Sequence, residues 1–377
     1  MYNLVKKVWR QKGWLKTYFS QSLKGTIGPH TLDNLEPPID FIISIANHFE
    51  PRVSTLGLAG AIEAIKEWCG GLEKIATRDF DGNPFKHTYY FPGENYNPGL
   101  LAPLEEHCKK GFGEVEVHLH HGLEKPDNAD HLEKTLEEYI KNLRLHGFLS
   151  YDKTDNSMKP RYCFVHGNWT LANSGQGEFC GVDNEMEILA KTGCYMDCTL
   201  PSAPHFTQIN KINSIYECGF PLSDAIPHRD GRDLAVGSGE PTFPFLLEGP
   251  LLINWKRKKK GIYVPGIENG AIHDLNPPTL DRFRLWVSAN IHVKGHPNWI
   301  FIKLHTHSLR NNHINSTRGL VMTKYLNDIG RFYNDGTKYR LHFATSRESA
   351  NIILAAIDGK TGNAGKYRNY RFILFES

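Results

Sequence analysis

The sequence of 377 residues lacks any long hydrophobic run. No stretch approaches the roughly 20 apolar residues that a membrane-spanning helix requires, and the opening MYNLVKKVWRQKGWLKTYF has no apolar core of the kind that a signal peptide carries. Cysteines are also few, and their number, seven, is odd, which fits reduced thiols better than a disulfide framework. From these absences we expect a cytoplasmic protein.

Charge of one sign is equally scarce, because the formal net charge is only +3. The longest like-charge run, KRKKK at 256–260, fits a solvated loop. No zinc-finger spacing or other nucleic-acid signature accompanies it, so we expect no nucleic-acid partner, and nothing indicates a particular protein partner. Internal repeats and linkers rich in Pro, Gly or Ser are missing as well. We therefore predict a single domain, residues 39–377, preceded by a basic and aromatic segment, residues 1–38.

Residues 1–20 admit two interpretations. They mix basic side chains with aromatic and aliphatic ones: Lys6, Lys7, Arg10, Lys12 and Lys16 against Val5, Trp9, Trp14, Leu15, Tyr18 and Phe19. A helix of this kind can lie on an anionic membrane, which would give peripheral contact with the inner face of the membrane. The alternative is an ordinary helix that packs its aromatic side chains on the domain and is interrupted at Gly13.

Short β-like runs that end in polar residues recur along the rest of the chain. They are IDFIISIANHFEP (39–51), HTYYFPGEN (87–95), GEVEVHLHHG (113–122), RYCFVHGNW (161–169), GCYMDCTLPSAP (193–204) and WIFIKLHTHS (299–308). Helical patterns lie between several of them, at 59–76 and at 130–147, where Gly147 is a candidate C-cap. Strands that alternate with helices predict a mostly parallel sheet, open or closed.

Two of these runs separate apolar from ionisable side chains with a period of two. In the first, Val115, Val117 and Leu119 share one face while Glu116, His118 and His120 share the other; in the second, Ile300, Ile302 and Leu304 oppose Lys303, His305 and His307. Central strands of an open doubly wound sheet are apolar on both faces. A barrel fits better, because its inner face can become polar near the carboxyl ends of its strands. We predict an α/β barrel of parallel strands with outer helices.

The same alternation places further polar side chains at the carboxyl ends of predicted strands. They are His48 with Glu50, Glu94, His166 with Asn168, and Asp197 with Thr199. Barrel enzymes keep their chemistry at this end of the barrel. We therefore expect these side chains to meet at one mouth.

Imidazole and carboxylate together predict a divalent metal, most simply zinc. A catalytic zinc site uses three protein ligands and leaves one position for water. His48, Glu50, His118 and His120 supply such a set, and His121 could replace His120. The alternative is that these histidines are hydrogen-bonded wall residues, or that they bind a sugar without metal.

Roles for the other polar side chains follow from hydrolysis at such a metal. Glu50 is the candidate base, and His305 or His307 is the candidate acid or oxyanion stabiliser. The alternative is that His305 and His307 form a structural hydrogen-bond network. A carbohydrate substrate suits His166, Asn168, Trp169 and Asp197, with Asn47 and Glu94 beside them; Trp169 could equally belong to the core. GQGEFCG (175–181) lacks the spacing of a dinucleotide-binding loop.

Three of these segments resemble motifs of the glycoside hydrolase/deacetylase barrel superfamily, and within it of the polysaccharide deacetylase-like proteins. GEVEVHLHHG resembles the metal-binding histidine motif, with His118 and His120 or His121 at the ligand places. IKLHTHS resembles the last-strand motif, with His305 as the catalytic histidine. SIANHFEP occupies the first-strand place, where the family carries adjacent aspartates. The resemblance implies an irregular barrel of about seven strands, written (β/α)7, a zinc-like cation and an N-acetylated sugar.

Longer phrases are similar to a deacetylase-like branch associated with bacterial surface-polysaccharide gene clusters. These are FVHGNW, CGVDNE, TGCYMDCTLPSAP and INSIY, and the similarity extends over about residues 39–355. It implies a metal-dependent hydrolase that removes an N- or O-acyl group, such as acetyl, from an amino-sugar-containing polysaccharide or its precursor.

The chain departs from the family at the first strand, where Asn47 and His48 replace the two acidic residues. The base must then come from elsewhere, and Glu50 is the nearest carboxylate. HFEP (48–51) also resembles the His-x-Asp-Pro run of zinc-dependent mannosidases. That likeness implies an alternative, a glycoside hydrolase with Asp197 as nucleophile or acid and Glu94 or Glu268 opposite. A third hypothesis is a catalytically inactive glycan-binding protein of a polysaccharide assembly system.

Overall fold

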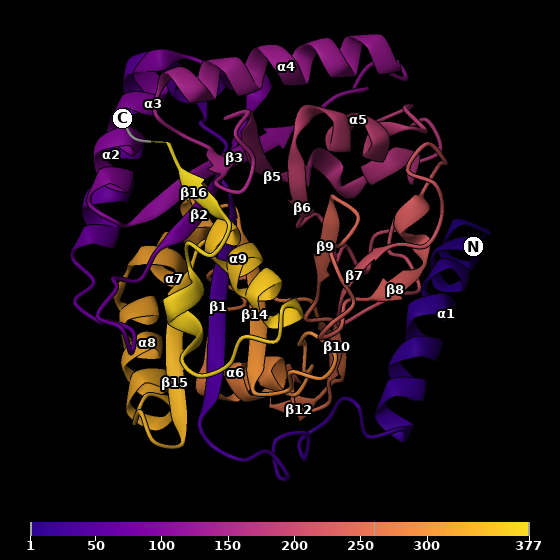
Figure 1. The fold of residues 1–377 in the computed structure, drawn as a ribbon, viewed down its shortest axis with the longest axis vertical. Coiled ribbons are helices and arrows are strands. Elements are labelled where there is room, and N and C mark those ends of the chain that lie inside the picture. The colour runs from indigo at the N-terminus through magenta and orange to yellow at the C-terminus, as the bar shows by residue number, and fades with distance from the viewer. Residues whose placement is uncertain (1, 260, 376–377) are drawn as a thin grey trace.

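The structure is a computed structural model that describes residues 2–259 and 261–375. It is a mixed α/β fold with a mostly parallel central sheet and flanking helices (Figure 1). The helices are α1 Tyr2–Leu23, α2 Val53–Glu73, α3 Pro98–Lys109, α4 Ala129–Leu145, α5 Glu185–Thr192, α6 Leu280–Val287, α7 Ile314–Arg318, α8 Leu320–Tyr333 and α9 Ser346–Ile357. The helical patterns at 59–76 and 130–147 correspond to α2 and α4, and Gly147 follows α4 with a φ of 75°.

The strands follow the predicted alternation with helices through most of the chain. They are β1 Ile39–His48, β2 His87–Pro92, β3 Gly113–Leu119, β4 Ser150–Asp152, β5 Pro160–His166, β6 Cys194–Asp197, β7 Ser214–Cys218, β8 Gly231–Asp233, β9 Phe245–Glu248, β10 Leu252–Asn254, β11 Lys258–Lys259, β12 Ile262–Tyr263, β13 Gly266–Glu268, β14 Trp299–Thr306, β15 Tyr339–Ala344 and β16 Phe372–Leu374. Each of the six predicted runs contains one of them.

The large sheet runs in the order β14-β1-β2-β3-β5-β6-β9-β7-β8, with β15 also paired to β1. Pairing is parallel from β14 to β9 and antiparallel from β9 through β7 to β8. Within the described residues this path has two ends, β14 and β8, and no strand pairing joins them. What the structure establishes is a curved, mostly parallel sheet with helices outside it.

The two faces of the sheet carry the alternation that the sequence predicts. Phe41, Ile43 and Ile45 of β1 pack with Val115, Val117 and Leu119 of β3 and with Ile300, Ile302 and Leu304 of β14 in the cluster that the helices cover. The opposite face carries Ile42 and Ala46 together with Tyr90 and Cys163. Burial of the outer cluster fixes which side chains turn inward.

The helix α1 runs along one side of the domain, opposite α2 and α8 (Figure 1). Gly13 does not interrupt it, contrary to the prediction. The helix passes close to Asn210 at this point, since a Cβ added to Gly13 would lie 1.6 Å from Asn210 Oδ1. Trp14 and Tyr18 are buried in the core, so this part of the helix packs on the domain. The side chains of residues 1–12, which the membrane hypothesis invokes, lie outside the described ones. None of the described helices is long and apolar enough to cross a membrane.

Ionisable groups are also buried within the sheet. One of them is Glu248 on β9, whose carboxyl group has a single hydrogen-bond partner in the described structure. Gln208 Nε2 donates to its Oε1 at 2.8 Å, while its Oε2 has no hydrogen-bond partner among the described residues. Burial raises the pKa of Glu248 to about 8, against the opposing effect of Gln208. The carboxyl group is therefore protonated over a wide pH range in the folded protein.

We expect the free energy of unfolding of the Glu248→Gln variant to fall less with rising pH than that of the wild type. Because the folded pKa lies above the unfolded one, the contribution of Glu248 is fully present below pH of about 4.3 and is lost as the pH rises toward the folded value, by up to about 1.4 kcal/mol per pH unit. Glutamine keeps a neutral hydrogen-bonding group that does not titrate. Urea unfolding at about pH 5 and about pH 8 measures the difference. Glu106→Gln, on the exposed face of α3, should keep the wild-type pH dependence.

Candidate metal centre

Five side chains from three strand ends converge at one end of the sheet. We call them the histidine centre: His48, Glu50, His118, His120 and His307. His48 ends β1 and Glu50 follows it by two residues, His118 and His120 come from the end of β3, and His307 follows β14. Because these strands are parallel, their carboxyl ends lie at the same end of the sheet.

Glu50 stands in the middle of the histidine centre. Its Oε1 lies 3.7 Å from His118 Nε2, 3.9 Å from His120 Nε2 and 3.6 Å from His307 Nε2. His48 packs against two of these rings, with centroid distances of 5.0 Å to His118 and 4.6 Å to His307. Ligand atoms of His48, Glu50 and His118 all lie within 4.8 Å of one another. This spacing is compatible with one cation held between imidazoles and a carboxylate.

His118 is set up as a metal ligand by its hydrogen bonding. Its Nδ1 donates to the carbonyl oxygen of Val165 at 2.7 Å. In the neutral ring Nε2 then carries a lone pair, and this buried atom has no hydrogen-bond partner among the described residues. Burying a nitrogen without a hydrogen-bond partner costs free energy. The unpaired His118 Nε2, which points toward Glu50, is therefore the clearest sign that the histidine centre is built to bind a ligand.

His120 is held by a carboxylate. Glu94 Oε1 lies 2.5 Å from His120 Nδ1, and Glu94 Oε2 accepts from the His120 backbone N–H at 3.3 Å. With Nδ1 donating to Glu94, Nε2 is directed toward Glu50. Orientation of a histidine by a second-layer carboxylate or carbonyl is the usual arrangement around metal-ligating imidazoles.

The electrostatics of the centre differ between its groups. Burial would lower the pKa of His120, but its hydrogen bond to Glu94 and the charge of that carboxylate outweigh it and raise this pKa. Burial would raise the pKa of Glu50, but the neighbouring imidazoles of His118, His307 and His120 outweigh it and lower this pKa to about 2. Burial, together with neighbouring imidazoles, lowers the pKa of His48 well below its usual value. Burial also lowers the pKa of His307 to about 4, although Glu50 opposes the shift. At neutral pH these two rings are uncharged, as metal ligation requires.

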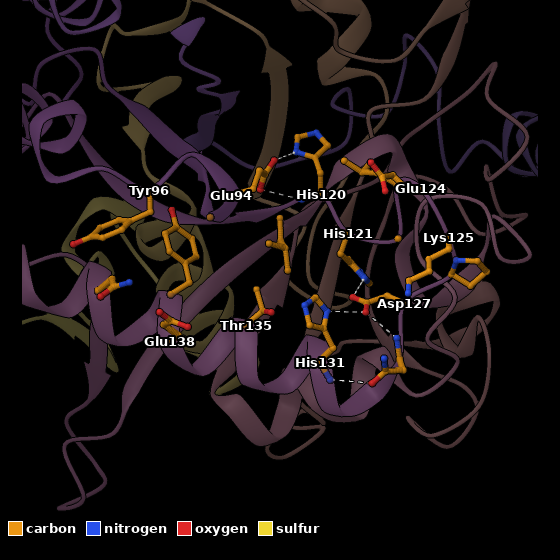
Figure 2. Close-up of a pocket in the computed structure, with 18 residues that line it drawn as sticks. Glu94, Tyr96, His120, His121, Glu124, Lys125, Asp127, His131, Thr135 and Glu138 are labelled. Atoms are coloured by element: carbon orange, nitrogen blue, oxygen red, sulfur yellow. Dashed lines mark hydrogen bonds and ion pairs between the residues drawn. The ribbon is translucent and has the colours of Figure 1, made fainter. Parts of the chain in front are cut away.

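The histidine centre is open to solvent on one side. Side-chain exposure is 25% for Glu50, 20% for His120 and 18% for His307. Beside it lies a pocket of ≈ 770 Å³ between the loop after β3 and α4. Figure 2 shows Glu94 and His120 at one side of this pocket, with Thr135 and Glu138 of α4 at another. A catalytic metal site needs such access, whereas a structural one is closed.

Two residues assigned by sequence belong to a different cluster. His121 does not replace His120, because its ring meets His166, with the two Nε2 atoms 2.9 Å apart, away from Glu50. Both are buried, together with Cys180 and Glu185. The structure thus places His166 in this buried cluster and not beside Glu50.

Asn47 faces the opposite side of β1 from His48. Its amide donates to Ser308 Oγ at 2.7 Å and lies 3.3 Å from His87 Nδ1, and the side chain is fully buried. It therefore does not contact substrate as predicted. An acidic residue at this position would not reach the histidine centre either.

Asp197 is enclosed inside the sheet. Its two oxygens accept from the backbone N–H and the hydroxyl of Thr199 at 2.9 Å and 2.8 Å, and burial raises its pKa to about 8. Glu268, one of the two carboxylates offered opposite Asp197 in the glycosidase hypothesis, accepts two hydrogen bonds from Arg282 and one from Trp286. Both carboxyl groups are occupied within the protein.

The remaining predicted residues border the centre. The His305 ring lies 6.5 Å from that of His48, and burial, with His307 and Lys303 adding to it, lowers its pKa to about 3. Asn168 and Trp169 follow β5 in left-handed backbone conformations, with φ of 57° and 58°, and are half-buried. The Trp169 ring packs at 5.4 Å from that of His205.

Sequence reasoning missed three contributors. Arg310 Nη2 lies 3.4 Å from Glu50 Oε2, and no spacing rule signals it because it comes from the turn after β14. Cys180 and Glu185 join His121 and His166. Both lie in the quoted phrase CGVDNE, five positions apart, and no spacing rule connects them to the two histidines.

No family model matches the chain, and a search of curated proteins finds no significant match.

We expect Glu94→Ala to weaken divalent-metal binding by about 10–100-fold, the usual cost of losing a carboxylate that orients a ligating histidine. The affinity of the purified protein for zinc, measured by competition with a chromogenic chelator, provides the test. Glu138→Ala is the matched control, because Glu138 lines the same pocket but is exposed on α4. Equal affinities in the two variants would mean that Glu94 does not act through His120.

Proposed function

We propose that the protein is a metal-dependent hydrolase that removes an acyl group, such as acetyl, from an amino-sugar-containing glycan or its precursor. The observation that carries the proposal is the buried, unpaired Nε2 of His118 beside Glu50. Around it stand His48, His120 and His307, at the carboxyl ends of parallel strands where α/β enzymes bind their substrates. The finer architecture that we propose is the irregular (β/α)7 barrel of the polysaccharide deacetylase-like proteins.

The residues that would hold the cation are His48 and His118, whose ligand atoms lie within 4.8 Å of one another and of Glu50, together with His120 or His307. Zinc is the metal that best suits a set of imidazoles with one carboxylate. When bound here, a zinc-like cation supplies Lewis-acid chemistry, polarising an acyl carbonyl and acidifying water.

Three side chains, Glu50, Arg310 and His305, would carry out the proton transfer and charge stabilisation that hydrolysis requires. Glu50, ionised at neutral pH, accepts the proton of the attacking water. Arg310, 3.4 Å from the second oxygen of Glu50 and half-exposed, carries a permanent positive charge that can stabilise a developing oxyanion. His305 is neutral and lies beside His48, so it acts as an acid only after taking up a proton during the reaction.

The pocket beside the histidine centre supports a carbohydrate substrate. Its lining includes the ring of Tyr96, the amide of Asn128 and the imidazole of His131. Aromatic faces stack on sugar rings, while amides and imidazoles hydrogen-bond hydroxyl groups. Seven free cysteines in the described structure favour action in a reducing compartment, and so on a cytoplasmic glycan precursor.

Two observations weigh against the alternatives. Asp197 is enclosed and hydrogen-bonded within the protein, whichever of Glu94 and Glu268 is taken as its partner, and a glycosidase needs two carboxyl groups facing the substrate. The inactive-protein hypothesis rested on Asn47, which faces away from the histidine centre. Acyl transfer to water is the chemistry that the remaining groups favour.

The activity test measures acetate released from N-acetylglucosamine oligomers and from 4-nitrophenyl acetate, with and without a chelator. We expect release that stops after chelation and returns with zinc. New reducing ends without acetate would instead establish the glycosidase. Binding of the oligomers without either product would establish the glycan-binding protein.

His118→Ala should lower the metal content by one ion per chain and abolish acetate release. The fold should persist, because the substitution removes a buried polar group whose Nε2 has no protein partner in the described structure. Elemental analysis and circular dichroism measure the two effects. A folded variant with the full wild-type metal content would exclude His118 as a ligand.

Glu50→Gln should lower the turnover number by about 10²–10⁴-fold, the usual contribution of a general base, while the metal content stays at the wild-type value. Elemental analysis and acetate release on the same preparation separate the two quantities. Loss of metal together with turnover would make Glu50 a ligand, and normal turnover would remove it from the mechanism.

A further inference from the structure

A second group of metal-ligating side chains lies behind the histidine centre. We call it the buried cluster: His121, His166, Cys180 and Glu185. His121 follows β3, His166 ends β5, Cys180 lies in the loop before α5, and Glu185 is the first residue of α5. Each of the four is buried, and one ligand atom from each lies within 4.8 Å of the others.

The distances inside the buried cluster are those of a compact site. His121 Nε2 lies 2.9 Å from His166 Nε2 and 3.1 Å from Glu185 Oε1, and His166 Nε2 lies 3.4 Å from the same oxygen. Cys180 Sγ lies 3.7 Å from Glu185 Oε2. Four ligands at zinc bond lengths of about 2.0–2.3 Å stand about 3.3–3.8 Å apart in a tetrahedron. The observed separations need only small adjustments to reach that arrangement.

The outer ring nitrogens of both histidines are already engaged. His121 Nδ1 lies 3.0 Å from Asp127 Oδ2, and His166 Nδ1 lies 2.5 Å from the carbonyl oxygen of Gly167. Both acceptors bind an N–H, so in neutral rings each Nε2 carries a lone pair. Two lone pairs that face each other at 2.9 Å, beside a carboxylate and a thiol, require a positive charge between them.

That charge is either a proton on His121 or a metal ion. A proton on His121 can be shared with His166 Nε2 and Glu185 Oε1. The Cys180 thiol then donates to Glu185 Oε2 at 3.7 Å or to the Val182 carbonyl oxygen at 3.8 Å. A cation engages all four side chains at once, and the pair of outer acceptors, one carboxylate and one carbonyl, is what ligating histidines use. The four buried side chains would fill all four coordination positions of the ion and leave none for an exchangeable water molecule.

We propose that the buried cluster is a structural zinc site with two nitrogen, one sulfur and one oxygen ligand. It is closed, whereas the histidine centre is open, which is the distinction between structural and catalytic zinc sites. Its work is to fix the loop at 174–184. That loop is already tied to its surroundings by Asp127 N–H, which donates to the Cys180 carbonyl at 2.7 Å, and by Ala172 N–H, which donates to Glu185.

The first experiment is elemental analysis of the full-length protein after gel filtration. We expect two zinc ions per chain in the wild type, one in His118→Ala, one in Cys180→Ser and none in the double variant. Cys218→Ser, which changes a partly buried thiol outside the cluster, should keep both ions. A folded Cys180→Ser protein with the full wild-type metal content would overturn the proposal.

A second measurement does not depend on the folding of a Cys180 variant. His118→Ala protein produced in cobalt-supplemented medium should show thiolate-to-cobalt charge-transfer absorption in the near ultraviolet, because among the described residues only the buried cluster groups a cysteine with histidines at ligand distances. Its absence, with no cobalt bound, would mean that a proton holds His121 and His166 together. That result would leave the proposed hydrolase untouched, since acetate release by the wild type tests it separately.

Discussion

The parallel register of β1 with β14, and of β3 with β2, holds the histidine centre together. Ala46 pairs with His305 and Pro92 with His118, so that the ends of these strands meet. Side chains alternate between the two faces, and a slip of one residue would turn the imidazoles toward the helices. What prevents the slip is the burial of apolar side chains such as Phe41 and Ile43 on the outer face. Hydrophobic packing on one face therefore determines the chemistry on the other.

Polar groups gathered this densely are tolerated because few of them are charged. The pKa values of His48, His305 and His307 are all lowered, first by burial, so these rings remain neutral. Glu50 is the one anion in their midst, and Arg310 reaches its outer oxygen from the solvent side. These three neutral rings beside the Glu50 carboxylate leave lone pairs and negative charge to be compensated. A divalent cation would provide that compensation, whereas protonation of several adjacent rings would be opposed by their mutual repulsion.

The sequence was sufficient for the strands β1, β2, β3, β5, β6 and β14 and for the two faces of β1, β3 and β14, because these depend on a period of two within one strand. It also led to the grouping of His48, Glu50 and His118, because the carboxyl ends of parallel strands meet. It did not predict where the side chains lie once the chain has left a strand. His121 was assigned beside His120, yet the backbone leaves the strand after Leu119 and the two side chains diverge. His166 was placed at the mouth, although its partners Cys180 and Glu185 arrive from a loop and a helix that no local pattern connects to it. Barrel closure, which depends on contacts between distant segments, likewise could not be read from period alone.

The segment after β3 links the two candidate metal sites. His118 and His120 turn toward Glu50, His121 turns toward His166, and Gly122 then reverses the chain with a φ of 65°. A Cβ on Gly122 would lie 2.3 Å from the carbonyl oxygen of Cys180, so the loop of the buried cluster is packed directly against this turn. A cation that fixes Cys180 and His121 therefore also limits where His120 can stand. An open site on a loop keeps its ligands in place only if the residues behind it are held rigidly.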